Sequence, residues 1–354
     1  MEARQLVFSA RGEVSFAACN VSAPAADQIL IETLYTAISP GTERAFLLAE
    51  PNTITQRSGF PFTPGYSNVG RVLEVGSAVR TFKRGDIVAT RQTHVSHFLL
   101  PETVGAQEPP EHYRGQFRSP IMPSEPATGL HYIWPLPASI DEATLKACAP
   151  FAIVGVGVTG ARYARIDLGE SVLVIGLGPV GLYAALSAKL AGGFPVLGLD
   201  VLASRRALGE QLGIDRVYAA PDAIDDAPAV VIEATGNPDA VNVAFRLCRR
   251  NGRVVLLGST RGVTPQVDFY TDVHRKGLTV IGAHVLTRPM LDASDGRWNA
   301  WDENALVLRL IVGGRIDTRP LIAHEFRIDD APAAYDLIQT APDTLGALLD
   351  WRKP

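Results

Sequence analysis

The stretch VLVIGLGPVGLYAALSAKLAG, Val172–Gly192, decides how this 354-residue chain is interpreted. An apolar run leads into three glycines at a Gly-x-Gly-x-x-Gly spacing, and a helix-like segment follows. In that order the first glycine allows a tight turn, the second lets a ligand approach the backbone, and the third lets the helix pack on the strand. The free N–H groups at the helix start favour an anion. The alternative is an ordinary glycine turn. We expect a pyrophosphate cradle formed by Gly176, Gly178, Pro179, Val180 and Gly181.

An acidic residue, Asp200, follows the next apolar run, FPVLGLD, nineteen residues after Gly181. A carboxylate at that strand end accepts hydrogen bonds from the ribose hydroxyls of adenosine and repels a 2′-phosphate. The sequence therefore predicts a dinucleotide cofactor and favours NAD over NADP. Arg205 and Arg206 lie just beyond. Arg205 is expected to contact the cofactor, and either arginine is a potential partner for a 2′-phosphate.

The order of apolar runs predicts an α/β fold. From about Phe151, five strand-like apolar runs follow one another: SVLVIG, FPVLGLD, AVVIEAT, GRVVLLGS and LTVIGAHV. Two helical segments lie between these runs, and the first of them starts near Val180. Nearly continuous apolar strands of this kind indicate a doubly wound parallel sheet that is covered on both faces. The first half is β-rich and broken by Gly and Pro, whereas the tail after about Asp302 has two helical segments and a final strand-like LGALLDW.

Composition limits the class of protein. Hydrophobic residues make up 47% and charged residues 20%, and the formal charge of −4 comes without a long basic run. We therefore expect a globular, two-domain protein with no nucleic-acid or membrane partner. The first residues lack a signal-peptide pattern, and no apolar run is long enough to span a membrane. Three widely spaced cysteines, Cys19, Cys148 and Cys248, fit a reducing compartment, so the cytoplasm is expected.

Several motifs resemble those of the medium-chain dehydrogenase/reductase superfamily. They are PGYSNVGRVLEVGSAVRTFKRGDIVA, GLGPVG, EATGNPDAV, GRVVLLG and HEFRIDDAPAAYDLI, and together they span nearly the whole chain. The resemblance implies a GroES-like catalytic domain made of residues 1–150 and 300–354, with a Rossmann dinucleotide-binding domain, residues 151–299, inserted into it. It also implies cofactor contacts at Thr159, Thr235 and Gly258.

Zinc members of that superfamily carry ligands at positions where this chain has none. Pro40 stands in the cysteine slot of SPGTER, and in PGYSN Tyr66 stands for His and Ser67 for Glu. The third ligand position aligns with Gly155 or Ala149. These residues cannot form a zinc site, and there is no four-cysteine cluster for structural zinc. A less orthodox metal site built from His94, His97, His112 and His131 is the alternative.

Without a metal, an organic group must move the hydroxyl proton. Tyr66 takes the position nearest to where zinc would lie, and Thr42 matches the hydroxyl that relays protons in zinc relatives. The alternative role of Tyr66 is an aromatic that only fills the vacated space. Glu43 is expected either to act as a base or to pair with Arg44. His94, His97 and His131 are rival acid/base residues.

A Pro-rich and polar stretch, Thr103–Trp134, is expected to be a long surface loop. Its His112, Tyr113, His131, Tyr132 and Trp134 would either bind a ligand by stacking and hydrogen bonding or form a dimer arm.

The function expected from these features is zinc-independent, NAD-dependent hydride transfer on a secondary alcohol or ketone. TAISPGTER and PLIAHEFRIDDAPAAYDLI resemble threonine-dehydrogenase-like enzymes of sugars, cyclitols and secondary metabolites, so the resemblance implies a polyhydroxylated or secondary-metabolite substrate. Two alternatives stay open: an NAD(P)H-dependent enone or quinone reductase, and a non-catalytic dinucleotide-binding relative. An open edge strand near LTVIGAHV favours a homodimer.

Overall fold

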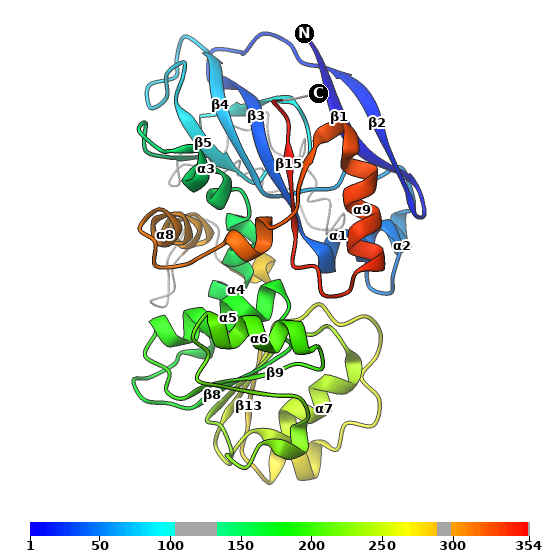
Figure 1. Cartoon of the computed structure of the whole chain (residues 1–354), viewed down its shortest axis with the longest axis vertical. Coiled ribbons are helices and arrows are strands. Elements are labelled where there is room, and N and C mark those ends of the chain that lie inside the picture. The colour runs from blue at the N-terminus through cyan, green and yellow to red at the C-terminus, as the bar shows by residue number, and fades with distance from the viewer. Residues whose placement is uncertain (103–132, 289–298, 353–354) are drawn as a thin grey trace. The chain divides into compact units, whose positions relative to one another are not determined.

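The computed structural model describes residues 1–102, 133–288 and 299–352. The chain divides into two compact units (Figure 1). The first consists of Met1–Ala152 together with Pro289–Pro354, and the second of Ile153–Arg288. Most of the stretch Thr103–Trp134, including His112, Tyr113, His131 and Tyr132, lies outside the described residues.

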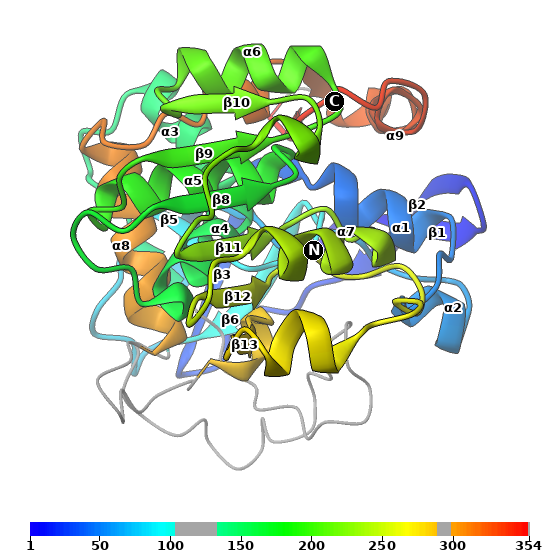
Figure 2. The same cartoon turned by 90° about the horizontal axis from the view of Figure 1, so that it is seen from below.

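The second unit is built on a parallel sheet, whose described part has six strands in the order β10-β9-β8-β11-β12-β13 (Figure 2). The strands are β8 (Val172–Ile175), β9 (Val196–Leu199), β10 (Arg216–Tyr218), β11 (Val230–Glu233), β12 (Arg253–Leu256) and β13 (Thr279–Gly282). The chain runs outward from β8 to β10, then returns to β11 on the other side of β8. This reversal is the topological switch point of a doubly wound fold, where ligands bind at the carboxyl ends of the strands.

Helices cover both faces of this sheet. Figure 1 shows α5 and α6 over one face and α7 over the other. Leu173, Ile175 and Val231 pack with Val241 and Phe245 of α7 in one apolar cluster, which explains why these short strands are apolar throughout. The helical elements are α4 (Phe151–Ala164), which starts at the boundary with the first unit, α5 (Pro179–Leu190), α6 (Ala203–Gln211), α7 (Pro238–Leu247), the π-helix η3 (Phe269–His274), and the 3₁₀ turns η2 (Pro221–Ala223) and η4 (Val285–Thr287).

The first unit is mainly antiparallel β-structure. Its large sheet has the order β14-β15-β3-β4-β5-β7, with β6 also paired to β3, and β1 and β2 form a separate hairpin. The C-terminal β15 pairs with β3, so the end of the chain completes the sheet that its first part begins. The strands are β1 (Glu2–Ala10), β2 (Glu13–Asn20), β3 (Gln28–Ile38), β4 (Asn68–Val75), β5 (Ile87–Thr90), β6 (His97–Pro101), β7 (Ile133–Pro135), β14 (Glu325–Arg327) and β15 (Ala347–Asp350).

Short helices close the ends of this unit. Pro40 opens α1 at a position where a missing N–H costs nothing, and Asp141 caps α3 by accepting from Thr144 N at 2.8 Å. Side chains of α1 and α9, such as Phe46 and Tyr335, share an apolar cluster with Leu349 of β15. The helical elements are α1 (Pro40–Leu47), α2 (Ile54–Ser58), α3 (Glu142–Cys148), α8 (Ala300–Val312), α9 (Ala331–Thr340), η6 (Arg319–Ile322) and η7 (Ile328–Asp330).

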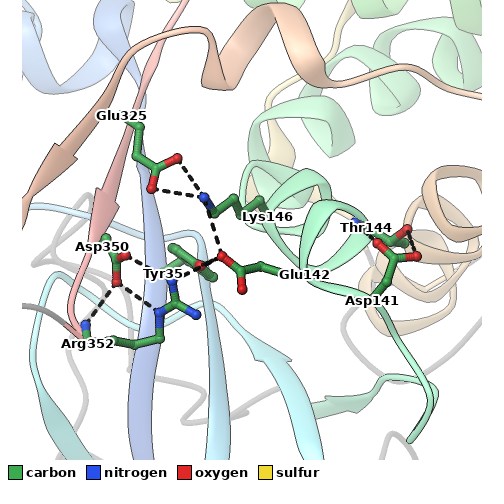
Figure 3. A network of polar contacts seen from close by, with 8 residues as sticks. All are labelled: Tyr35, Asp141, Glu142, Thr144, Lys146, Glu325, Asp350 and Arg352. Atoms are coloured by element: carbon green, nitrogen blue, oxygen red, sulfur yellow. Dashed lines mark hydrogen bonds and ion pairs between the residues drawn. The ribbon is translucent and has the colours of Figure 1, made fainter.

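A polar network fastens the C-terminal strand to β3 and α3 (Figure 3). The buried Tyr35 of β3 donates to Glu142 Oε1 at 3.0 Å, and Arg352 lies over its ring at 4.5 Å. Arg352 also pairs with Asp350 at 3.0 Å, while Lys146 pairs with Glu325 at 2.7 Å. Burial, followed by the hydrogen bond to Glu142, raises the pKa of Tyr35, so its hydroxyl remains a donor.

The fold class predicted from the sequence is confirmed: a parallel Rossmann-like sheet and a separate antiparallel β-rich unit are both present. The apolar runs of the second half form β8, β9, β11, β12 and β13. One assignment was wrong. Trp134 lies on β7 and is only 1% exposed; it stacks on Trp301 and donates to the Trp301 carbonyl at 3.1 Å. It is therefore a core residue and not a ligand-binding group of a loop.

Within the described residues, no single helix has both the length and the apolar character needed to cross a membrane. Taken together, the consecutive helices α3 and α4 have enough length and apolar character for a span, but a bend of 54° separates them.

Candidate functional site

The glycines of the second unit are required for different reasons. Gly176 directly follows β8 with φ +88°, and a Cβ there would stand 2.6 Å from Thr235 Cγ2. A Cβ on Gly181 would stand 1.7 Å from the Gly176 carbonyl oxygen, so only glycine allows α5 to pack here. Gly178 differs. Its φ of −67° suits any residue, and a Cβ would meet only Arg205, at an ordinary 3.5 Å. Packing does not demand this glycine, whereas close approach of a ligand does.

The N-terminus of α5 is open for an anion. Gly178 is its N-cap residue and supplies no side chain to satisfy the first N–H groups, while Pro179 occupies the first turn. Val180 lies in the same turn and is half-buried. Gly157 of α4 packs against this helix, because a Cβ on it would stand 2.6 Å from Ala184 N. The residues present thus fit a pyrophosphate at this helix tip.

Asp200 lies at the end of β9 and is 6% exposed. Its Oδ2 accepts from Leu177 N at 2.7 Å and its Oδ1 from Leu202 N at 2.8 Å, so the carboxylate braces the glycine loop. Each oxygen keeps capacity for a further donor, such as a ribose hydroxyl. The Arg205 guanidinium lies 3.7 Å from Asp200 and also beside Gly178. Arg206 instead donates to the carbonyl oxygens of residues 200 and 201, at 2.8 and 2.9 Å.

The other residues expected to contact the cofactor also have packing or hydrogen-bonding contacts within this unit. Thr159 is fully buried in α4 and donates to Gly155 O at 2.8 Å. Thr235 packs on Gly176 and accepts from Asn237 N at 2.9 Å. A Cβ on Gly258 would stand 2.6 Å from the backbone nitrogen of residue 236, so this glycine lets two loops meet. Thr235 and Gly258 follow β11 and β12, at the carboxyl edge of the sheet.

Glu233, at the end of β11, is a functional candidate that the sequence analysis did not single out. It is fully buried, and its Oε1 accepts from the backbone N–H of Thr235 at 2.6 Å and from the Thr235 hydroxyl. Its Oε2 has no hydrogen-bond partner among the described residues. Burial raises the pKa of this carboxyl group. The available signal was a carboxylate inside an otherwise apolar strand, in the quoted motif EATG.

In the first unit, Tyr66 lies near polar and charged side chains. Ser39 and Thr42 lie near its phenol, and Arg91 lies over its ring at 6.0 Å. Burial raises the pKa of the Tyr66 phenol, and the charge of Glu43 raises it further. The bonds with Ser39 and Thr42 and the charge of Arg91 act in the opposite direction. A neutral phenol beside groups that stabilise a phenolate is able to donate and recover a proton.

Glu43 and His94, both nominated from the sequence, are in direct contact. Their side chains are 1% and 0% exposed, and His94 Nε2 lies 3.0 Å from Glu43 Oε2. The pairing of Glu43 with Arg44, one of two expectations, was wrong: Arg44 pairs with Glu50 at 2.8 Å. Neighbouring residues on a helix point in different directions, so α1 separates Glu43 from Arg44.

His97 lies elsewhere on the same unit. It is half-buried on β6, and its Nδ1 is 3.1 Å from Ser96 Oγ. With Cys19, Gln92 and Thr93 it lines a surface groove of about 330 Å³. Burial lowers the pKa of His97. Among the hydrogen bonds of the described chain, none joins His97 to the Glu43–His94 pair.

Comparison with known proteins shows which family this chain resembles. Residues 179–298 match a family model described as zinc-binding dehydrogenase. The chain is 28% identical to L-threonine 3-dehydrogenase of Vibrio vulnificus strain CMCP6 over 316 residues, 82% of each chain. It is 26% identical to sorbitol dehydrogenase of Ovis aries over 300 residues, 78% of this chain and 77% of that one. Galactitol-1-phosphate dehydrogenase from Escherichia coli has the same fold, with a TM-score of 0.74, 17% identity and coverage of 98% and 100%. The chain belongs to the medium-chain dehydrogenase/reductase superfamily.

Membership confirms the superfamily predicted from the motifs, and it makes this protein an oxidoreductase. Both of these relatives are dehydrogenases named for small-molecule substrates.

The positions that the motif resemblance assigns to zinc ligands carry Pro40, Tyr66 and Ser67, which are not the usual zinc-ligand residue types. Pro40 begins α1, and Ser67 is 1% exposed, with its hydroxyl donating to Ala149 O at 2.5 Å and accepting from Ala152 N at 3.2 Å. Tyr66 lies near Ser39 and Thr42. Within the part of the chain that is described, no group of three His, Cys, Asp or Glu side chains could hold a metal ion. His112 and His131 lie outside that part.

Proposed function

We propose that this protein is a zinc-independent, NAD-linked dehydrogenase. Its proposed substrates are a secondary alcohol, or the matching ketone, of a polyhydroxylated or secondary-metabolite molecule. The observation that carries the proposal is the placement of Tyr66, which occupies a zinc-ligand position of the superfamily and is surrounded by Ser39, Thr42 and Arg91. Substrate class is inferred from the TAISPGTER and PLIAHEFRIDDAPAAYDLI resemblance to sugar and cyclitol enzymes.

NAD is proposed as the cofactor because of Asp200. A buried carboxylate at the end of β9 favours ribose hydroxyls and opposes a phosphate dianion at the same place. Bound nicotinamide supplies or accepts the hydride. The chain's own contribution in this unit is to hold the pyrophosphate at the start of α5 and the adenosine ribose at Asp200, with Arg205 beside both.

Tyr66 is proposed to move the proton. In ketone reduction its O–H bond breaks and the proton goes to the carbonyl oxygen, which becomes the alcohol. The resulting phenolate is stabilised by hydrogen bonds from Ser39 and Thr42 and by the positive charge of Arg91. Thr42 then relays a proton from solvent back to the phenolate. In alcohol oxidation each step runs in reverse.

Fluorescence titration and a substrate panel test this proposal. NADH should bind more tightly than NADPH, and sugars, cyclitols or aryl alcohols should reduce NAD. Reduction of enones, with NADPH preferred to NADH, would favour the enone-reductase alternative. NADH binding without turnover of any substrate would favour a non-catalytic relative.

Gly178→Ala provides a specific prediction for the cradle. The methyl group fits the folded chain, so we expect stability to change by less than about 0.5 kcal/mol. Because the same methyl group blocks backbone approach to the pyrophosphate, NADH affinity should fall about tenfold or more. Gly181→Ala is the contrasting variant, and we expect it to destabilise the protein by about 1–3 kcal/mol. Thermal melts and NADH titration measure both; an unchanged NADH affinity in Gly178→Ala would contradict the cradle.

A homodimer through β13 is also proposed. This strand is the edge of the parallel sheet, and Val280 on it is 40% exposed. Phe269 and Tyr270 of η3 are 66% and 65% exposed. Val280→Lys should shift sedimentation from dimer toward monomer, because edge charges oppose pairing of strands. Leu168→Lys, which charges a 91% exposed position of the same unit, serves as the control. A dimer that survives Val280→Lys unchanged excludes β13 as the interface.

A cytoplasmic location is proposed from the cysteines. All three lie in the described residues and none forms a disulfide. Burial raises the pKa of the Cys148 thiol to about 12 and that of the Cys248 thiol to about 11, so both remain unreactive thiols.

A further inference from the structure

Glu233 ends β11 at the carboxyl edge of the parallel sheet, where β11 lies between β8 and β12 (Figure 2). Its side chain is fully buried, and the rest of the strand is apolar. A buried carboxyl group costs free energy that an apolar residue of similar size would not. The presence of a carboxyl group here is therefore explained by what its oxygens do.

One oxygen of this carboxyl group shapes the turn that follows β11. Oε1 accepts from Thr235 N at 2.6 Å and from the Thr235 hydroxyl. The same hydroxyl accepts from Asn237 N at 2.9 Å, and the Asn237 side chain caps α7 by accepting from Asp239 N at 3.0 Å. The Glu233 side chain therefore fixes the path of the chain from the end of β11 to the start of α7.

The turn fixed in this way packs against the loops after both neighbouring strands. Toward β8, Thr235 fills the space beside Gly176, since a Cβ on this glycine would stand 2.6 Å from Thr235 Cγ2. Toward β12, the Glu233 carbonyl oxygen accepts from Gly258 N at 2.8 Å, and a Cβ on Gly258 would stand 2.6 Å from Gly236 N. The loops after β8, β11 and β12 thus share one support at the carboxyl edge of the sheet.

The second oxygen of Glu233 adds no hydrogen bond to this support. Oε2 is buried without a hydrogen-bond partner among the described residues, and a Cβ on Gly258 would stand 3.0 Å from it. Burial raises the pKa of the carboxyl group, while the bonds from Thr235 act against this rise. An unsatisfied buried oxygen reduces stability. Stability alone therefore does not account for Glu233, whereas a fixed arrangement of the three loops does.

We infer that Glu233 is a positioning residue for the bound dinucleotide: it fixes the loops after β11 and β12 against the glycine loop, so that they receive the part of the cofactor beyond the pyrophosphate. A dinucleotide crosses the switch point of a doubly wound sheet. Asp200 follows β9 and marks the adenosine side, so the other half belongs on the side of β11 and β12. Because Glu233 is buried, it acts through these loops and does not touch the cofactor. The inference rests on the proposed function, in which the glycine loop holds NAD.

The test measures the affinity of the full-length protein for NADH and for AMP, which carries only the adenosine end. Glu233→Met keeps the length of the side chain and removes both oxygens, Glu233→Gln keeps an acceptor for Thr235, and Thr235→Val removes only the hydroxyl. The matched control is Asp215→Leu. Asp215 also braces a backbone N–H, that of Val196 at 2.7 Å, but at the start of β9 on the opposite edge of the sheet. Thermal melts accompany each titration.

Glu233→Met should weaken NADH binding about tenfold or more and leave AMP binding within about twofold. Thr235→Val should weaken NADH binding by a smaller factor, and Glu233→Gln should stay within about threefold of the wild type because the acceptor is kept. Asp215→Leu should lower the melting temperature and leave both affinities within about twofold. Unchanged NADH affinity in both Glu233→Met and Thr235→Val overturns the inference. An equal loss of NADH and AMP binding also overturns it, because that result indicates a general loosening of the unit.

Failure of the proposed function gives a different result in the same titrations. A wild-type protein that binds NADPH more tightly than NADH refutes the NAD linkage. In that case, a loss of NADPH affinity without a loss of AMP affinity in Glu233→Met still supports the inference. A wild-type protein that binds neither dinucleotide overturns both.

Discussion

Tyr66→Phe is expected to lower the turnover of ketone reduction by about 10²–10⁴-fold, the usual contribution of a positioned acid or base. The variant keeps the ring and loses only the hydroxyl, which lies near Ser39 and Thr42. NADH affinity should stay within about twofold, because Tyr66 is not among the residues proposed to hold the pyrophosphate and the adenosine ribose. Steady-state kinetics with NADH fluorescence titration measures both quantities.

His94 and His97 are the alternative proton donors if this expectation fails. If turnover is retained in Tyr66→Phe, the phenol only fills space and the proton must come from another group. His94→Gln and His97→Gln then identify that group. On the present account His97→Gln has little effect, because His97 contacts Ser96 and lines a separate groove.

Asp200→Gly is expected to reduce the preference for NAD over NADP by about 100-fold in kcat/KM. The variant removes the carboxylate that repels a 2′-phosphate. Two like charges placed side by side at an interface cost several kcal/mol. Arg205, 3.7 Å from Asp200, becomes available to the phosphate, so part of the effect should be a real gain in NADP affinity.

Asp200→Asn separates the two roles of this side chain. The amide oxygen still accepts one of the bonds from Leu177 N and Leu202 N, so the loop keeps part of its bracing while the charge is lost. We expect Asp200→Asn to lose discrimination with a smaller loss of NAD affinity than Asp200→Gly. Unchanged discrimination in both variants would show that Asp200 does not select the cofactor.

The fold of the second unit was predictable because its signals are local. Each glycine of the motif follows from a steric requirement or from ligand approach, and the apolar runs that lead into Gly176 and Asp200 correspond to β8 and β9. Trp134 was misassigned because Pro and polar residues dominate the segment before it. Its burial depends on Phe151 and Trp301, which are distant in sequence.

The candidate site of the first unit was predictable only in part. Tyr66, Thr42 and Glu43 were found because they occupy superfamily positions with a known chemical role, and His94 because of its residue type. No local pattern pairs Glu43 with His94, 51 positions later, or with Tyr335, 292 positions later. Such contacts come from sheet closure and helix packing, which bring α1, the segment before β6 and α9 into one unit.

The most direct test of the account is the metal content of the active, purified protein, measured by mass spectrometry together with turnover before and after chelation. We expect far less than one zinc ion per chain and turnover that chelation leaves unchanged. One zinc ion per chain, whose removal abolishes turnover and whose return restores it, would contradict the proposal that Tyr66 acts in place of a metal.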